Sequence, residues 1–579
     1  MSIKMKVASI SPKLYVGNPT KNCNEIISAL DSLKHDCIDV IAFPELCLSG
    51  CTCGDLFFHD TLIDACKNNI DLITEYSKDY YSHIIIGSPV KEDSRLYNCA
   101  VHIYKGEIVE IISKKHLCAS ELRWFTSGYE VKSQNSYFDI SVGDDIYYEK
   151  YKSDVVLNIG ASPALVTKYD NYKSFIKNYT EQRNCAYISA SAGSCESTTD
   201  YVYAGECVHA VSGKIISEAE RFSFETKIII SEFDAPASKE IDNIDFTITE
   251  AEKLKGNPFI PSDADELNRR CDEILKIQST GLAKRMLHIH CNKLVLGISG
   301  GLDSTHALLV CVEALKKLNL PIENLICITM PGFGTTDLTY TNACNLVKLI
   351  GATFMEINVK EASLQHFKDI CHDVDVHDVT YENTQARERT QILMDYANKI
   401  GAIVVGTGDL SELALGWCTY NGDHMSMYGV NASVPKTLMR HLVKYIADKS
   451  DENVAKTLYS VLDTPVSPEL LPPDKNGKME QKTENTLGPY EVHDYFIYYF
   501  IRHNKSPEEL LKMAVNNFQG QYCENELRNW LTIFIRRFFN NQFKRSCMPD
   551  GPAVGTVSLS PRGAWSMPSD AFNDEWLKF

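Results

Sequence analysis

Several features of membrane-spanning, secreted or zinc-binding proteins are missing from this sequence. No uninterrupted apolar run approaches the roughly 20 residues of a membrane-spanning helix, and residues 1–13 contain no apolar core of a signal peptide. No two of the 20 cysteines have CxxC spacing, and the densest group, at 47–53, has no His-rich partner segment, so neither a zinc site nor a disulfide framework is expected. We therefore expect a cytoplasmic protein with buried free thiols and no membrane partner.

Positive charge is also scarce. Lys and Arg number 58 against 76 Asp and Glu, which gives a formal net charge of −18. This balance argues against a general nucleic-acid binder, whose affinity depends on a basic face. It leaves room for a phosphorylated small molecule, because such a ligand needs only a local pocket of backbone amides and a few cations.

The chain of 579 residues has an ordinary globular composition, and its apolar pattern predicts two α/β domains. In the first ~235 residues, short apolar strands such as 6–10 and 40–43 alternate with helical spacing such as 24–34. Residues 236–265 are polar and rich in proline, which is typical of a linker. From 266 to 579 the pattern resumes, with helices at 266–288 and 305–318 around a strand at 294–298. This alternation favours a parallel sheet that is covered on both faces.

A glycine-rich loop follows the strand at 294–298. It reads Ser299-Gly300-Gly301-Leu302-Asp303-Ser304 and leads directly into a helix. The two glycines allow the backbone to approach a polyanion closely, and backbone amides with the Ser299 and Ser304 hydroxyls can hold a pyrophosphate. Asp303 places a carboxylate where Mg²⁺ would bridge phosphate oxygens. The motifs GxxxxGK[ST] and strand-GxGxxG are absent, and a plain glycine-rich turn is the alternative interpretation.

This loop resembles the SGGxDS loop of the ATP-pyrophosphatase family, which includes several different reactions. Further segments, in this order, are similar to the NAD synthetases of that family over nearly all of residues 290–579: 383–389, 406–417, 422–424, 435–437, 481–484, 488–491, 542–546 and 559–563. Another reaction of the family, such as GMP synthesis, is less well supported, because 481–484 and 488–491 fit NAD synthetase better.

The resemblance implies a ligase that amidates nicotinic acid adenine dinucleotide (deamido-NAD) with ATP and Mg²⁺. The reaction would pass through an acyl-adenylate and release pyrophosphate and AMP, and Lys436 would neutralise charge developing on the phosphates. The ATP contacts implied are Gly297, Ile298, Ser299, Gly300, Gly301, Leu302, Asp303, Ser304, Arg387 and Thr407. Asp303 and Glu412 would bind Mg²⁺. The deamido-NAD contacts implied are Asn383, Glu412, Asp423 and Lys544. For Arg389 both a ligand contact and a structural role stay open.

The amino-terminal half resembles a nitrilase-type amidase domain, on Phe43–Gly50, Gly54–Phe57 and stretches up to residue 235. Such a domain is fused to NAD synthetases of the glutamine-dependent type. The resemblance implies an α-β-β-α sandwich followed by a doubly wound α/β domain, in homo-oligomers built on synthetase dimers. Amidase chemistry in this family uses Glu, Lys and Cys. Glu45 fits the base and Lys114 the cation, with Lys115 as a close alternative.

The cysteine nucleophile is missing. Its expected position, near Gly143, lies in a stretch without cysteine between Cys118 and Cys185. Because glycine cannot form a thioester, we predict that the amidase domain is inactive, that Glu45 and Lys114 persist as a buried ion pair, and that ammonia is the direct nitrogen source. The alternatives are a displaced nucleophile (Cys185, Cys195 or Cys207), a separate glutaminase subunit, and a non-enzymatic scaffold.

Overall fold

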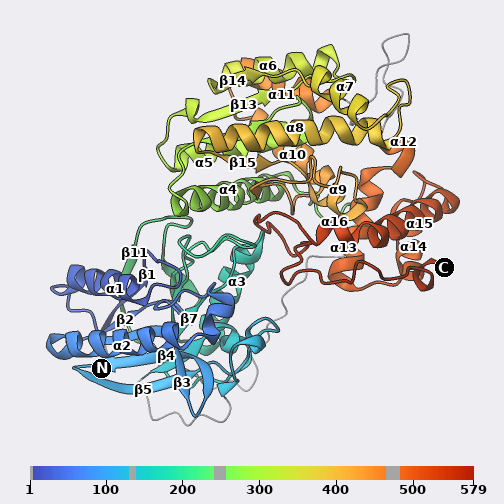
Figure 1. The fold of residues 1–579 in the computed structure, drawn as a ribbon. Helices are drawn as coiled ribbons and strands as arrows, with labels where there is room; N and C mark the ends of the chain where they lie inside the picture. Colours follow the sequence, from blue (N-terminus) through green and yellow to red (C-terminus); the bar gives the residue numbers. More distant parts are fainter. Residues whose placement is uncertain (1–3, 129–137, 240–255, 465–482) are drawn as a thin grey trace. The chain divides into compact units, whose positions relative to one another are not determined.

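The structure, a computed structural model, describes residues 4–128, 138–239, 256–464 and 483–579 (Figure 1). The chain forms two compact units. Unit 1 comprises Met1–Ser197 and Val202–Glu250, and unit 2 comprises Thr198–Tyr201 and Ala251–Phe579. Four residues inside the first stretch of chain therefore belong to the second unit.

Unit 1 is built on two β-sheets. The six-stranded sheet has the order β11-β1-β2-β3-β4-β5, with bounds β1 Lys4–Ser11, β2 Val40–Ala42, β3 His83–Glu92, β4 Arg95–Tyr104, β5 Glu107–Ser113 and β11 Lys227–Asp234. The five-stranded sheet has the order β10-β9-β8-β7-β6, with bounds β6 Asp139–Val142, β7 Val155–Gly160, β8 Ala186–Ser191, β9 Val208–Val211 and β10 Lys214–Glu218. Aliphatic side chains of both sheets form one buried cluster, which includes Val40 and Ile85 from the first sheet and Leu157 and Ile188 from the second.

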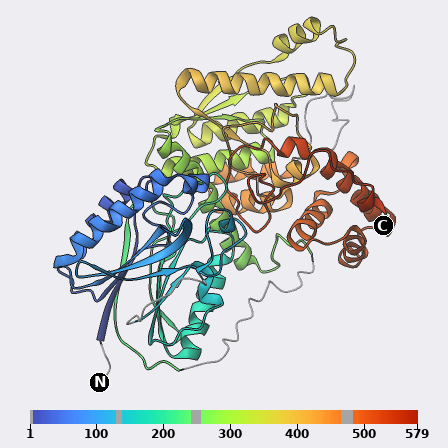
Figure 2. The ribbon, with the colours of Figure 1, turned by 60° about the horizontal axis from the view of Figure 1, so that its bottom comes forward.

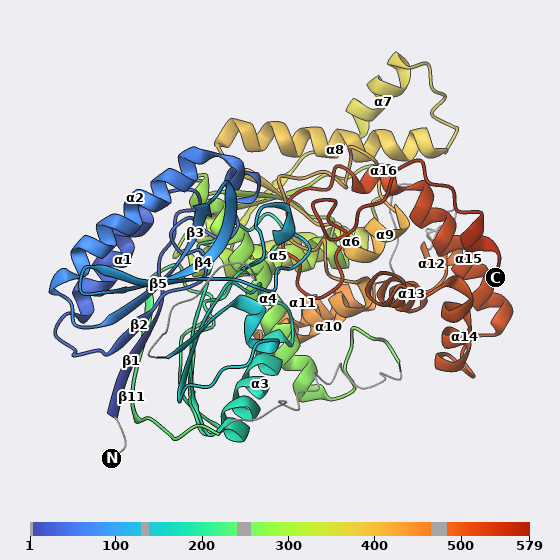
Figure 3. The ribbon, with the colours of Figure 1, turned by 90° about the horizontal axis from the view of Figure 1, so that it is seen from below.

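Helices cover the outer faces of this sandwich. In unit 1, α1 (Pro19–Leu33) and α2 (Asp60–Tyr76) lie side by side along the six-stranded sheet, and α3 (Lys168–Arg183) packs on β8, β9 and β10 (Figure 3). The layers are therefore α-β-β-α, which confirms the predicted sandwich. Sequence periodicity did not predict α3, because its buried face is mostly tyrosine, threonine and arginine rather than aliphatic.

Unit 2 contains a five-stranded parallel sheet of order β14-β13-β12-β15-β16. Its strands are β12 Leu294–Gly297, β13 Leu325–Thr329, β14 Thr353–Glu356, β15 Ile403–Gly406 and β16 Tyr428–Gly429. The order reverses between β12 and β15, so this is the doubly wound arrangement that was predicted. In such sheets, ligands bind beyond the carboxyl ends of the strands on either side of the reversal.

The sheet of unit 2 lies between α8 and the helices α4 and α5 (Figure 2). The helices around it are α4 Ala264–His288, α5 Leu302–Lys317, α6 Asp337–Ile350, α7 Lys360–Asp369, α8 Val379–Ile400, α9 Leu410–Leu415, α10 Lys436–Ala447 and α11 Glu452–Asp463. A helical, aromatic-rich cluster follows, with α12 Thr483–Leu487, α13 Tyr490–His503, α14 Pro507–Asn517, α15 Glu524–Asn540 and α16 Gln542–Arg545. Helix α5 begins at Leu302, three residues before the predicted 305, so residues 302–304 of the phosphate loop form its first turn.

Other parts of the structure bear on the remaining expectations. All 20 cysteines lie in the described ranges and are free. Twelve are buried as predicted, but Cys37, Cys118, Cys371 and Cys523 are exposed, so the expectation of buried thiols is wrong for these four. Among the helices of the described ranges, none has the length and apolarity needed to cross a membrane. Helix α4 begins at Ala264, inside the predicted linker, whose residues 240–255 lie outside the described residues, as do 481 and 482 of the segment 481–484.

Candidate active site

The phosphate loop connects β12 to α5. Ser299 and Ser304 face each other with their hydroxyl oxygens 3.1 Å apart, and the Gly301 amide donates to Ser299 Oγ at 3.2 Å. Gly301 is the N-cap of α5, and no side chain in the described part of the chain caps this helix. The first amides of α5 are thus available to an anion at the positive end of the helix dipole.

The two glycines of the loop are required for different reasons. Gly300 has φ +84°, and a Cβ there would lie 2.0 Å from the Thr339 carbonyl oxygen of α6. A Cβ on Gly301 would meet only Ser299 Oγ, at 3.4 Å. Gly300 is therefore needed for packing and backbone conformation, whereas Gly301 leaves an open face on the loop.

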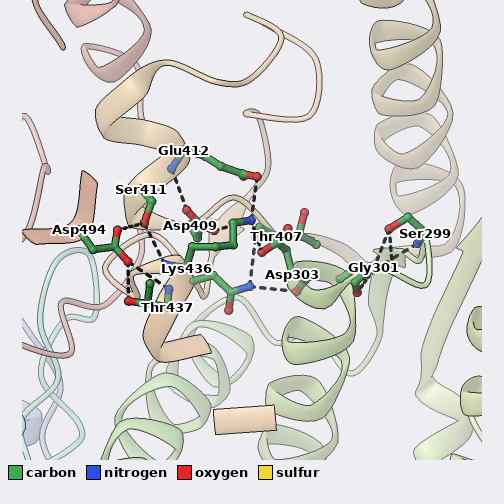
Figure 4. Close-up of polar contacts among 12 residues, drawn as sticks. Ser299, Gly301, Asp303, Thr407, Asp409, Ser411, Glu412, Lys436, Thr437 and Asp494 are labelled. Carbon is green, nitrogen blue, oxygen red and sulfur yellow. Dashed lines mark hydrogen bonds and ion pairs between the residues drawn. The ribbon is translucent and has the colours of Figure 1, made fainter. Parts of the chain in front are cut away.

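Three carboxylates surround one lysine beside this loop (Figure 4). Lys436 Nζ lies 2.7 Å from Asp303 Oδ1, 2.7 Å from Asp409 Oδ2 and 2.9 Å from Glu412 Oε1. We call Asp303, Asp409 and Glu412 the carboxylate cage. The structure thus brings together the predicted residues Asp303, Glu412 and Lys436. Asp409 was not predicted, because its position before α9 is explained by capping alone: Oδ1 accepts from the Glu412 amide at 2.8 Å.

Burial and mutual proximity shift the pKa values of this group. Burial raises the pKa of Asp409 to about 7 and that of Glu412 well above its usual range, although Lys436 opposes both shifts. Burial alone would lower the pKa of Lys436, but the three carboxylates together hold it well above the usual value. The lysine is therefore a permanent cation in this environment.

A buried aspartate fixes the start of the helix that carries Lys436. Asp494 of α13 accepts hydrogen bonds from the Ser411 hydroxyl and, at 3.1 and 2.6 Å, from the amide and hydroxyl of Thr437 (Figure 4). The Lys436 amide donates to Ser411 Oγ at 2.9 Å. Burial raises the pKa of Asp494 to about 6. Asp494 was not predicted; the one sequence feature that could have drawn attention to it is its position next to the aromatic run Tyr495–Phe500.

Asn431 connects the loops that follow β12 and β15. Its Nδ2 donates to the main-chain oxygens of Asp303 at 3.1 Å and Thr407 at 3.0 Å. Asn431 is fully buried, and its Oδ1 accepts from Gln278 of α4 at 3.3 Å. The predicted contact Thr407 is in this way held against the first turn of α5.

A second group of predicted residues gathers on the loop 416–424. Thr419 donates to Asn383 Oδ1 through its hydroxyl and to Asp423 Oδ1 through its amide, both at 2.7 Å. Lys544 Nζ donates to the carbonyls of Gly416 and Cys418 at 2.8 and 2.7 Å. Burial raises the pKa of Asp423 and lowers that of Lys544.

The two predicted arginines of α8 have separate positions. Exposed Arg387 donates to the Tyr420 carbonyl at 3.2 Å, so it belongs to the group on the loop 416–424. Arg389 donates to the Met330 carbonyl at 3.0 Å, which gives it a structural contact at the end of β13.

A small cavity lies between Glu412 of the cage and the loop 416–424. It encloses about 40 Å³ and is lined by residues that include Thr407, Glu412, Asp423 and His424. The carboxyl end of β15, Glu412 and the loop thus face one space, at the edge of the sheet where ligands of doubly wound folds bind.

Unit 1 contains a separate buried ionic group. Lys114 Nζ lies 2.8 Å from Glu45 Oε1 and 2.8 Å from Glu121 Oε1, and Asn98 Nδ2 donates to Glu45 Oε1 at 2.6 Å. Burial raises the pKa of Glu45, although the charge of Lys114 opposes this shift. Burial lowers the pKa of Lys114, but the charges of Glu45 and Glu121 outweigh it, so the pKa of Lys114 is raised. Lys115 instead pairs near the surface with Glu149. The stretch 121–125 resembles the amidase domain, but no role was predicted for Glu121 itself.

Gly143 lies against this ion pair. It has φ +56°, and a Cβ at this position would be 2.6 Å from Lys114 Nζ and 2.8 Å from Glu45 Oε2. The side chains of Lys114 and Glu45 thus fill the space that a residue with a side chain at 143 would need.

The other cysteines considered are buried. Burial raises the pKa of Cys185 to about 11 and that of Cys207 to about 12, and Cys195 is 7% exposed. Cys51, which was not among the predicted nucleophiles, is near Glu196 and Tyr203, and burial with the Glu196 charge raises its pKa well above the usual value. These shifts keep Cys51, Cys185 and Cys207 protonated at neutral pH, and a thiol is a poor nucleophile.

Comparison with known families matches both halves of the chain. A carbon-nitrogen hydrolase family model matches residues 6–240, and a NAD synthase family model matches residues 274–530. The crystal structure of a glutamine-dependent NAD(+) synthetase from Cytophaga hutchinsonii has the same fold, with a TM-score of 0.81 and 21% identity over 99% of both chains.

Curated relatives match along the whole chain. The glutamine-dependent NAD(+) synthetase of Mycobacterium leprae is 31% identical over 99% of this chain and 97% of its own length. That of Aquifex aeolicus is 27% identical over 96% and 97%. The chain belongs to the family of glutamine-dependent NAD(+) synthetases.

Proposed function

We propose that this chain is a NAD⁺ synthetase that amidates deamido-NAD at the expense of ATP and takes its nitrogen directly from ammonia. Family membership supports the ligase reaction. The observation that carries the choice of ammonia is Gly143: the place where a nucleophile would have to stand beside Glu45 and Lys114 has no side chain.

The residues around the phosphate loop fit ATP and Mg²⁺. The open face at Gly301, the uncapped amides of α5 and the hydroxyls of Ser299 and Ser304 suit a pyrophosphate. The cage offers carboxylate oxygens within 4.8 Å of one another, which are the ligands that Mg²⁺ prefers. Asp303 and Glu412 would hold the metal, which supplies positive charge to the phosphates when bound.

The chemistry requires positioning and charge neutralisation rather than a protein nucleophile. An oxygen of the nicotinate carboxylate bonds to the α-phosphorus as the bond to pyrophosphate breaks. Ammonia then bonds to the acyl carbon, the bond to AMP breaks, and the nitrogen loses a proton. Lys436 would stabilise the negative charge on the phosphates, and Thr407 would contact ATP.

The loop 416–424 supports a site for deamido-NAD. Asn383, Arg387, Asp423 and Lys544 converge on it, and Asp423 faces the same cavity as Glu412. A substrate bound at this loop would have part of its surface near Glu412, which belongs to the carboxylate cage beside the phosphate loop. We assign Asn383, Asp423 and Lys544 to binding of deamido-NAD and keep Arg387 as an ATP contact, and we expect homo-oligomers built on synthetase dimers.

The test is NAD⁺ formation from deamido-NAD, ATP and Mg²⁺ with either ammonium or glutamine as the sole nitrogen source. We expect turnover with ammonium and at least a hundredfold less with glutamine. Equal turnover with glutamine would refute the inactive amidase, and Cys51→Ala, Cys185→Ala, Cys195→Ala and Cys207→Ala would then locate the nucleophile. No turnover with either source would refute the synthetase and favour a scaffold.

A separate glutaminase subunit is distinguished by the same assay. Purified chain that is inactive with glutamine but gains glutamine-dependent turnover when a cell extract is added would draw on such a subunit. The ammonium-dependent rate would be the same in both cases, because it depends only on unit 2.

A further inference from the structure

The carboxylate cage already holds a cation, the ammonium of Lys436. Its Nζ donates to Asp303 Oδ1 and Glu412 Oε1 and lies 2.7 Å from Asp409 Oδ2. The Lys436 side chain is 2% exposed. In this position the ammonium is directed at carboxylates, although the proposed function requires it on phosphates.

A divalent metal ion bound by the same carboxylate oxygens could not coexist with Nζ. Mg²⁺ binds oxygens at roughly 2.0–2.1 Å, and Nζ lies within 2.9 Å of all three oxygens. The metal would therefore stand next to the ammonium, with no space for water between two positive charges. The two cations compete for one site.

We propose that Lys436 and a divalent metal ion occupy the carboxylate cage in turn, with Asp409 as its third carboxylate. Lys436 fills the cage of the nucleotide-free protein. The metal that enters with the nucleotide displaces it and frees the ammonium for the phosphates. The destination of the freed ammonium rests on the proposed function, whereas the competition itself does not.

Asp409 has an oxygen for this purpose. Its Oδ1 is used in capping α9, while Oδ2 is buried and pairs with Lys436 Nζ at 2.7 Å, outside the geometry of a regular hydrogen bond. A buried carboxylate oxygen without a donor is costly unless a cation compensates it. Lys436 compensates it by proximity, and a metal ion could do so by coordination.

The backbone allows Lys436 to leave without disturbing its helix. Lys436 is the first residue of α10, and its amide is held by Ser411, which is in turn held by Asp494. The side chain can therefore turn away from the cage while the start of α10 stays in place. The cage itself is fixed from α5 and from the capped end of α9.

The experiment measures Mn²⁺ binding to the full-length, nucleotide-free protein by titration calorimetry and by the electron paramagnetic resonance of free Mn²⁺. We expect Lys436→Met, which keeps the side-chain length without its charge, to bind Mn²⁺ at least tenfold more tightly than the natural protein. Lys444→Met is the matched control: it lies on the same helix, is 54% exposed and pairs with Asp448. Unchanged or weaker Mn²⁺ binding by Lys436→Met would overturn the proposal.

Two further measurements test the proposal even if Lys436→Met does not fold without metal. If Lys436→Met folds only with Mn²⁺ present, the metal has replaced the lysine, as proposed; if Mn²⁺ and Mg²⁺ do not restore it, the competition is refuted. Asp409→Asn should weaken Mn²⁺ binding at least tenfold, and unchanged binding would remove Asp409 from the site. If the natural protein does not synthesise NAD⁺, the proposed function is refuted, but the Mn²⁺ binding results still test the competition for the cage.

Discussion

Replacement of Lys114 by methionine should destabilise unit 1 without affecting the synthetase reaction. Lys114 is 6% exposed and lies 2.8 Å from Glu45 and from Glu121, which are 3% and 16% exposed. The variant leaves two carboxylates without their cation. Removing one partner of a buried pair costs about 3–5 kcal/mol, which for a unit of this size lowers Tm by roughly 6–20 °C.

The loss of stability in Lys114→Met should depend on pH. Burial already raises the pKa of Glu45, and without Lys114 the folded carboxyl would bind its proton more tightly still. A folded pKa above the unfolded one gives stability at low pH that is lost as pH rises through the folded pKa. The deficit of Lys114→Met should therefore be smallest near pH 5 and grow towards pH 8.

Scanning calorimetry of the full chain measures this effect, and the neighbouring lysine provides the control. Lys115 and Glu149 are 39% and 23% exposed, and an exposed pair contributes less than about 1 kcal/mol. Lys115→Met should therefore have nearly the natural Tm. If Lys114→Met melts like this control, or if it stays folded and loses ammonia-dependent turnover, the ion pair is not merely structural and our reasoning is refuted.

Three further predictions concern unit 2. Asp303→Ala and Glu412→Ala should each lower ammonia-dependent turnover at least a hundredfold, measured as NAD⁺ formed at saturating Mg²⁺; near-normal rates would contradict metal binding there. Gly301→Val should abolish ATP binding in calorimetry while keeping Tm, whereas Gly300→Ala should lower Tm because its Cβ would clash with α6; the opposite pattern would reverse these roles. Burial lowers the pKa of His306 to about 4, so its contribution to stability is lost as pH falls from 6.5 to 4. The fall in Tm between pH 6.5 and pH 4 should therefore be smaller in His306→Gln than in the natural protein. The same Tm–pH profile in both proteins would contradict this role of His306.

The phosphate loop could be predicted because strand, loop and helix are contiguous in the chain. Local order alone places Ser299, Asp303 and Ser304 at a helix start. That Glu412 and Lys436 lie near Asp303 could be predicted only from the family resemblance, because 109 and 133 residues separate them from Asp303 in the chain.

The missed residues have two physical explanations. Asp409 has a sufficient local function as a cap, so nothing in the sequence showed that its second oxygen meets Lys436. Asp494 and Asn431 act through contacts with segments remote in the chain, and a sequence pattern does not record such pairs. The nucleophile position that we propose to be empty was different: the absence of cysteine between Cys118 and Cys185 was visible in the sequence, but only the structure shows that Lys114 and Glu45 lie against Gly143.

The discontinuity of unit 2 has a consequence for how this gene can be shortened. Thr198–Tyr201 belong to that unit, where Asp200 pairs with Arg562 at 2.8 Å and Thr198 bonds to the Gly281 carbonyl at 3.1 Å. A fragment that begins at residue 251 would lack these four residues and leave Arg562 without this partner. The amino-terminal half of the chain therefore supplies part of the framework of unit 2, whether or not it catalyses a reaction, and a truncation at residue 251 would remove that part together with unit 1.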